Sequence, residues 1–124
     1  MEIGSFCTKN KVDLLFGVAS FSGIKYEKIA MALSYIHDQF LAPSNIRPIA
    51  LEQGYINMDI IPKEKIDKLV ALNQIPSLLK SYLRLGAKVG EGAFLDIELN
   101  TIDILIIIEV TNMTKKYKAY YEKL

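Results

Sequence analysis

The run Ile104–Ile108 constrains the fold of this chain more than any other feature. It holds five consecutive apolar residues, four of them isoleucine, and Ile102 and Val110 extend it at either end. Isoleucine favours strands, and a strand that is apolar on both faces has to be covered on both sides. The sequence therefore predicts a central strand here, in a sheet with further layers packed on it.

A short helix and a glycine-rich segment precede this strand. Pro76 suits a first helical position, and Gly86 suits the left-handed residue at a helix exit. Between them lies one apolar stripe with helical spacing, formed by Ile75, Leu78, Leu79, Tyr82 and Leu83. Beyond three glycines, apolar and polar residues alternate over 95–99, which predicts a half-buried strand.

The remaining segments complete an α/β pattern. The sequence predicts a covered strand over 14–19, an amphipathic helix over 26–40, and a helix with a tyrosine stripe over 113–124. Residues 2–11 have weak helical spacing, and residues 41–63 form a long excursion with one short strand around Ile56. A short helix is expected over 63–72, with an inward face of Ile66, Leu69, Val70 and Leu72. A sheet flanked by helices is the expected fold.

Charge and composition exclude several function classes. A length of 124 residues suits one domain, and a net charge of +1 gives no overall attraction to nucleic acid. The single cysteine, Cys7, fits a reducing compartment, and no apolar run is long enough to span a membrane. We therefore expect a cytoplasmic protein. No metal-ligand spacing and no phosphate-binding glycine loop occurs, so no metal and no bound cofactor is expected.

His37 is the titratable residue that the pattern itself singles out. It lies four residues after Leu33 and three before Phe40, on or beside the buried stripe of the helix over 26–40. A structural, half-buried histidine explains this position. An acid or base in a cleft also explains it, because histidine titrates near neutral pH.

A series of segments in order along the chain points to a known family. They are LLFGVASF at 14–21, LSYIHDQFLAP at 33–43, Arg47-Pro48, Met58-Asp59 ahead of Pro62, YLRLGAKVGEGA from Tyr82, and Asp96 with Asn100-Thr101 and Asp103. In this order they resemble the C-terminal half of the bacterial L-ornithine N-alpha-acyltransferases. These are GNAT-superfamily enzymes of ornithine-lipid synthesis, sometimes labelled hemolysin-like.

The resemblance implies a fold and a reaction. It implies that residues 1–124 form one partial domain, the C-terminal half of a GNAT-like mixed sheet flanked by helices. It implies transfer of a 3-hydroxyacyl group from acyl carrier protein to the alpha-amino group of ornithine, with the acyl thioester as donor. The lipid product implies peripheral contact with a membrane. The parts that grip the donor in this superfamily would precede residue 1.

The resemblance also suggests roles for individual residues. Tyr35 is the expected acid that protonates the departing thiolate, and His37 is the expected base or orienting residue. The carboxylates expected to bind the cationic amino acid are those of Glu91 and Asp96. The expected patch for the acidic carrier protein consists of Lys80, Arg84 and Lys88. The alternatives are a packed tyrosine ring and a solvated basic helix face. Glu91 and Ile97 depart from the family pattern, which leaves the acceptor open.

Three hypotheses about the whole chain follow. In the first, a separate polypeptide supplies the N-terminal half, and the two parts associate along a bare edge of the strand over 14–19. In the second, the chain is a non-catalytic remnant of a longer gene. In the third, it is a small ligand-binding module that dimerises to cover the open edge.

Overall fold

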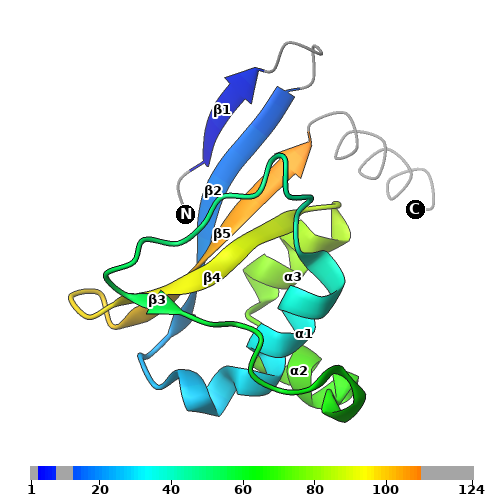
Figure 1. Cartoon of the computed structure of the whole chain (residues 1–124), viewed down its shortest axis with the longest axis vertical. Helices are drawn as coiled ribbons and strands as arrows, with labels where there is room; N and C mark the ends of the chain where they lie inside the picture. Colours follow the sequence, from blue (N-terminus) through cyan, green and yellow to red (C-terminus); the bar gives the residue numbers. More distant parts are fainter. Residues whose placement is uncertain (1–2, 8–12, 110–124) are drawn as a thin grey trace.

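The computed structural model describes residues 3–7 and 13–109, which form a five-stranded sheet and three α-helices (Figure 1). The strands are β1 (Ile3–Cys7), β2 (Asp13–Ser22), β3 (Tyr55–Ile56), β4 (Lys88–Asp96) and β5 (Thr101–Glu109). The helices are α1 (Ala30–Phe40), α2 (Lys68–Gln74) and α3 (Ser77–Arg84), with 3₁₀ turns η1 (Tyr26–Ile29) and η2 (Lys63–Lys65). The strand order is β1-β2-β5-β4-β3, and each neighbouring pair is antiparallel. The predicted α/β class, a sheet flanked by helices, is confirmed.

Strand β5 lies in the middle of the sheet, as its isoleucine run predicted. It pairs with β2 on one side and β4 on the other. Successive side chains of a strand point to opposite faces. Ile107 packs on one face with Leu14 and Ala42. The side chains that enter the main core on the other face are Ile102, Ile104, Ile106 and Ile108.

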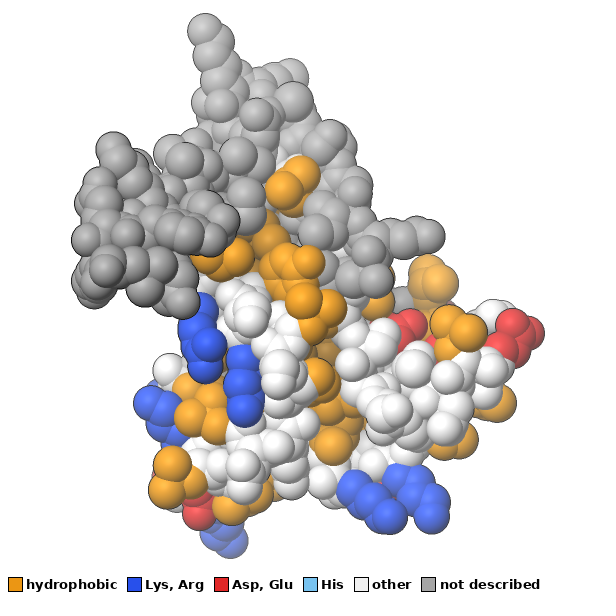
Figure 2. All heavy atoms as spheres, turned by 180° about the vertical axis from the view of Figure 1, so that it is seen from behind, with side chains coloured by type: hydrophobic (Ala, Val, Ile, Leu, Met, Phe, Trp, Pro, Cys, Tyr) orange, Lys and Arg blue, Asp and Glu red, His pale blue; other side chains and the backbone are white. Residues whose placement is uncertain are grey.

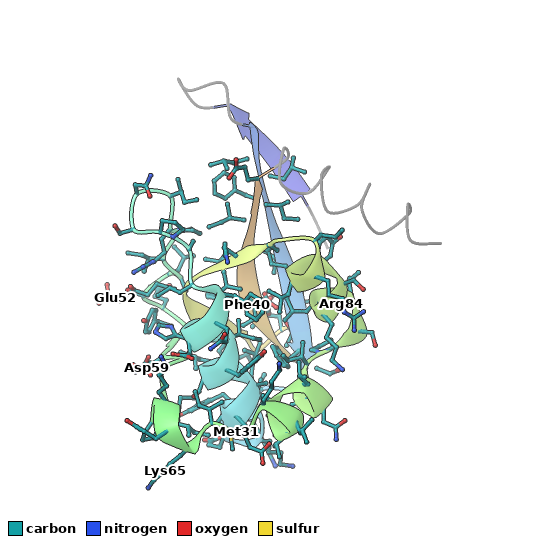
Figure 3. The ribbon with its side chains drawn as sticks, turned by 90° about the vertical axis from the view of Figure 1, so that its right-hand side faces the viewer. Met31, Phe40, Glu52, Asp59, Lys65 and Arg84 are labelled. Carbon is teal, nitrogen blue, oxygen red and sulfur yellow. The ribbon has the colours of Figure 1, made fainter. Side chains whose placement is uncertain are left out.

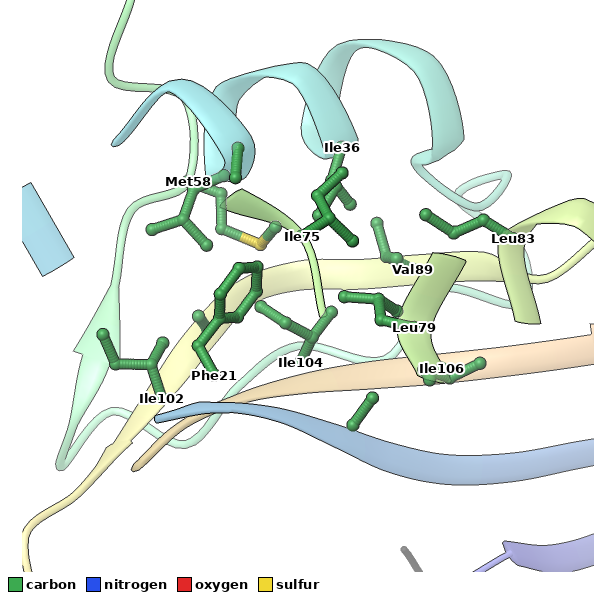
Figure 4. Packing of buried hydrophobic residues seen from close by; sticks show 14 of the residues in the cluster. Phe21, Ile36, Met58, Ile75, Leu79, Leu83, Val89, Ile102, Ile104 and Ile106 are labelled. Carbon is green, nitrogen blue, oxygen red and sulfur yellow. The ribbon is translucent and has the colours of Figure 1, made fainter. Parts of the chain in front are cut away.

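The three helices cover the same face of the sheet and share this main core. Figure 4 shows Ile36 of α1 and Leu79 of α3 pointing toward Ile104 of the sheet. Not every residue of the predicted stripes is buried, because α2 and α3 are short and each offers only a narrow contact face. Ala71 is fully buried. The stripe residues that are exposed are Leu69, Val70 and Leu78, and those that are partly buried are Ile66, Leu72 and Tyr82.

The strand predicted over 95–99 is wrong. Strand β4 ends at Asp96, and the chain turns before β5 begins at Thr101. The Asp96 carboxylate accepts a hydrogen bond from the Leu99 N–H at 3.0 Å, and Asn100 has a φ of 55°, both typical of a turn. Ile97 and Leu99 therefore face solvent. The body of β4 is the glycine-rich segment before them, where Gly92, at a φ of 77°, lies in a bulge.

The structure confirms the short strand predicted within the long segment 41–63, and this strand is β3. Before β3, the segment forms two isolated parallel bridges with β4, Leu41 to Val89 and Ile49 to Glu91. These bridges are the parallel pairings among the described residues. Ala42 is buried against the second face of the sheet. The excursion therefore covers part of the face that the helices leave open.

The prediction for the N-terminal segment is also wrong. Instead of helix, residues 3–7 form β1, which pairs with Asp13–Gly17 of β2. Hairpin pairing overrides weak helical spacing here. Strand β2 is consequently not a bare edge along its whole length. Its first part is paired with β1, and its segment 18–22 is paired, among the described strands, with β5 alone. The helix predicted over 113–124 lies outside the described residues. Within them, no helix has the length and apolar character needed to cross a membrane.

Candidate functional site

Several hollows lie beside α1. A smaller one is lined by Tyr35, Asp38, Gln39, Lys63, Ile66 and Lys68 and shares lining residues with the two larger ones. The first, called here the basic-rimmed groove, has a volume of about 310 Å³ and is lined by Tyr35, Phe40, Leu72, Ile75, Lys80, Leu83 and Arg84. The second, called the acidic cavity, has about 570 Å³ and is lined by His37, Asp38, Leu41, Asp59, Ile61, Pro62, Lys63, Glu64 and Ile66. Tyr35 and His37 are two residues apart, roughly 200° around a helix axis. The structure therefore places the two predicted catalytic residues in different hollows.

The basic-rimmed groove contains Tyr35 and two residues of the predicted carrier-protein patch. The Tyr35 ring packs edge-on against Phe40, with centroids 6.0 Å apart and an interplanar angle of 74°. The third patch residue, Lys88, lies with its Nζ 5.9 Å from the centroid of the Phe40 ring. Figure 3 views the helix layer with Phe40 and Arg84 labelled on α1 and α3. The structure thus gathers Tyr35 and the basic trio Lys80, Arg84 and Lys88 around one apolar hollow.

The basic trio has no acidic partner in the described part of the chain. The ion pairs there join Arg47 to Glu91 and Lys63 to Asp38. Figure 2 shows basic side chains next to apolar ones on the side of the molecule that holds α3. The charge at this hollow is therefore available to an anionic ligand.

His37 lines the acidic cavity with part of its imidazole buried. Its Nδ1 atom is buried and has no hydrogen-bond partner among the described residues. Three carboxylates share the cavity wall, those of Asp38, Asp59 and Glu64. No three histidine, cysteine or acidic side chains of the described residues are close enough to hold a metal ion. The Lys63 ammonium lines the same cavity and pairs with Asp38 at 3.9 Å, so the wall carries three carboxylates and one amine.

Glu91 and Asp96 lie away from both hollows. The Glu91 carboxylate forms an ion pair with Arg47 at 3.3 Å, and Arg47 also donates from Nε to the Ala42 carbonyl at 2.8 Å. Asp96 holds the turn between β4 and β5. Neither residue lines the groove or the cavity. The structure gives both predicted substrate ligands intramolecular partners.

Sequence reasoning missed several residues of these hollows. Asp38 follows His37 directly, and Asp59 belongs to one of the segments that resemble the family. Glu64 lies outside the inward face expected for the helix over 63–72. Phe40 is an ordinary member of a helical stripe, and only the arrangement of the three helices on the sheet places it in the groove.

Comparison with known proteins finds relatives whose sequences align with nearly the whole of this chain. L-ornithine N(alpha)-acyltransferase from Rhodobacter capsulatus is 36% identical over 121 residues, which cover 98% of this chain. Proteins of the same name from Agrobacterium fabrum and Brucella abortus are each 38% identical over 117 residues, or 94% of this chain. The chain is a homologue of these acyltransferases.

The match covers only part of each relative. The chain spans 46% of the Rhodobacter protein, 40% of the Agrobacterium protein and 42% of the Brucella protein. These fractions are consistent with the C-terminal half that the sequence resemblance indicated. No family model and no solved structure matches the chain.

Proposed function

We propose that this chain supplies the C-terminal half of an N-acyltransferase. The proposed reaction moves a 3-hydroxyacyl group from acyl carrier protein to the alpha-amino group of ornithine. The main support is the 36–38% identity to L-ornithine N(alpha)-acyltransferases over 94–98% of the chain. The chain spans less than half of each relative, so the proposed active unit also includes an N-terminal half. The split-enzyme hypothesis assigns that half to a separate polypeptide.

The proposed chemistry is an aminolysis of a thioester. The neutral amine attacks the carbonyl carbon, the amide C–N bond forms, and the C–S bond breaks. We assign the proton that the departing thiolate takes to the Tyr35 hydroxyl, at the basic-rimmed groove. The amine releases one proton to the candidate base His37 or to solvent, and solvent returns one proton to Tyr35, so protons balance. The location of Tyr35 beside the basic trio supports this assignment.

The proposed donor is an acyl thioester on acyl carrier protein. Lys80, Arg84 and Lys88 would bind the acidic surface of that protein, because opposite charges steer association. A GNAT-type fold for the complete enzyme, a cytoplasmic location and peripheral contact of the product with the membrane belong to the same proposal. No bound cofactor is required, since the thioester carries the acyl group.

The proposed acceptor needs carboxylates for its cationic groups. Glu91 and Asp96 remain candidates from the family resemblance. The carboxylates of the acidic cavity are additional candidates, beside the His37 imidazole, which is the candidate base. His37 and Tyr35 line different hollows. Each can therefore be replaced alone to test its own role in the reaction.

The N-terminal half would meet this chain along a strand edge other than the one predicted. Strand β1 occupies the first part of β2, so that segment cannot receive a new strand. The segment 18–22 of β2 has β5 as its only partner among the described strands, and β1 is an edge of the sheet. These two edges are the proposed docking positions.

The test is an acyl-transfer assay with 3-hydroxyacyl carrier protein and ornithine. It uses the full chain alone, and then the chain with the N-terminal half of a related acyltransferase. We expect product only when both parts are present. No product in either case, with the N-terminal half shown to bind the chain, would contradict the proposal and favour a non-catalytic remnant.

Variants of the active mixture test the residue roles. Tyr35→Phe should lower kcat by about 100-fold or more with little change in KM, as for loss of a general acid. His37→Gln should alter the pH profile of kcat if His37 is the base. An unchanged rate with Tyr35→Phe would remove Tyr35 from the mechanism.

A further inference from the structure

We propose that the basic-rimmed groove binds a single-chain anionic amphiphile. Its alkyl chain would occupy the apolar floor, and its carboxylate or phosphate would lie between Lys80 and Arg84. This inference goes beyond acyl transfer, because such binding requires neither a thioester nor the N-terminal half.

The floor of the groove is apolar and anchored in the core. Ile75 is buried and Leu83 is 8% exposed, and both belong to the main core cluster. Tyr35, Phe40 and Leu72 are partly buried and pack against the same cluster. Such a floor keeps its shape without a ligand. A volume of about 310 Å³ is at the lower end of the range for small-molecule sites, which suits one unbranched chain.

The rim of the groove carries unbalanced positive charge. Lys80 and Arg84 are four residues apart on α3, so they are neighbours on one helix face. Like charges at this spacing repel each other, and no carboxylate of the described residues forms an ion pair with either. An anion between them would relieve the repulsion, and a guanidinium binds carboxylate or phosphate with paired hydrogen bonds.

The combination of floor and rim selects the class of ligand. The acidic surface of a carrier protein, proposed above to bind these cations, would not by itself fill the apolar floor. A neutral apolar molecule would fill the floor but would leave the cations without a partner. An amphiphile with one chain and one anionic head satisfies both parts of the groove.

Titration calorimetry of the full 124-residue chain tests the inference. The probes are dodecanoate, dodecyl phosphate and dodecanol, each below the concentration at which it aggregates. We expect saturable binding of one molecule of either anion, and binding of dodecanol at least tenfold weaker. Comparing the two anions shows which head group the rim prefers. Shortening the carboxylate chain should weaken binding by up to about fourfold per methylene group.

Charge reversal on the rim supplies the matched variants. Lys80→Glu combined with Arg84→Glu should weaken dodecanoate binding at least tenfold. Lys68→Glu, an exposed lysine of α2 outside the groove, should change it less than twofold. Both changes lie on the surface, and a circular dichroism spectrum checks that each variant is folded.

Several outcomes would overturn the inference. They are equal affinity for dodecanol and dodecanoate, the absence of saturation, and unchanged binding after the double charge reversal. Binding to vesicles of anionic phospholipid without binding to single dodecanoate molecules would also overturn it, in favour of a membrane surface. Failure of acyl transfer would leave these binding results intact, so the two proposals fail separately.

Discussion

At the scale of single residues, the structure gives Glu91 several contacts within the chain. The sequence suggested a ligand for the cationic substrate. In the structure, its carboxylate pairs with Arg47, its N–H donates to the Pro48 carbonyl at 2.8 Å, and its carbonyl accepts from Ala50 at 3.0 Å. These contacts fasten the excursion to β4, so one residue holds two distant segments together.

Replacing Glu91 with glutamine distinguishes its structural role, the ion pair with Arg47, from the suggested role as a ligand for the cationic substrate. We expect Glu91→Gln to lower the free energy of unfolding by about 0.5 kcal/mol, because a partly exposed ion pair contributes little. Urea denaturation measures this loss, and Glu98→Gln in the exposed turn is the control. A substrate role would instead appear as a tenfold higher KM for ornithine in the reconstituted enzyme.

At the scale of elements, α1 is positioned by polar contacts from two other segments. The Ser34 hydroxyl accepts hydrogen bonds from the Ile60 and Ile61 N–H groups, at 3.1 and 2.8 Å. The Gln74 side chain at the end of α2 accepts from the Ala32 N–H at 3.0 Å. These contacts fix the wall of the acidic cavity against the helix that carries His37.

Ser34→Ala should therefore loosen that wall. Removing this buried acceptor takes away the partner of the Ile61 N–H, whereas the Ile60 N–H keeps its second acceptor, the Met58 carbonyl at 3.0 Å. We expect a loss of about 1–3 kcal/mol. Hydrogen exchange should become faster at Ile61. The control is Ser81→Ala, an exposed serine within α3, which should change neither stability nor exchange there. Unchanged protection at Ile61 would contradict the assignment.

The start of α2 depends on one capping residue. The Asp67 carboxylate accepts hydrogen bonds from Leu69 N–H at 3.0 Å and Val70 N–H at 3.2 Å. We expect Asp67→Ala to lower the free energy of unfolding by about 1 kcal/mol, and Asp67→Asn to preserve it, since asparagine caps as well. Thermal and urea denaturation compare the two. Equal losses would show that charge, and not capping, is what Asp67 contributes.

At the scale of the whole molecule, one core joins the sheet to all three helices. Its side chains come from β2, β4 and β5 on one side and from α1, α2 and α3 on the other. Because these elements share one cluster, we expect a single unfolding transition for the described part of the chain.

A pair of isoleucines tests this organisation. Ile104 is fully buried in the main core, whereas Ile97 is 72% exposed in the turn after β4. Ile104→Ala should cost about 3 kcal/mol, as for other large-to-small changes in a core. Ile97→Ala should stay within about 0.5 kcal/mol. A large loss from Ile97→Ala would mean that another surface covers this turn.

The sequence by itself determined the elements whose patterns are local and strong. The isoleucine run predicted the central strand because a strand buried on both faces leaves no polar position. The helical spacing over 26–40 predicted α1, and the family resemblance placed the chain with its relatives. The strand and the helix follow from residues that are close together in the chain, and the resemblance follows from the order of segments along it. Both kinds of information are present in the sequence itself.

Only the tertiary structure decided the rest, because it depends on residues far apart in the chain. The alternation over 95–99 predicted a strand, but the pairing of β4 with β5 makes it a turn. Pairing with β2 likewise turned a weak helical pattern into β1. The groove lies where α1, α2 and α3 meet on one face of the sheet, which brings Tyr35 near Lys80 and Arg84. Helix geometry then separates Tyr35 from His37, since residues two apart point to nearly opposite sides.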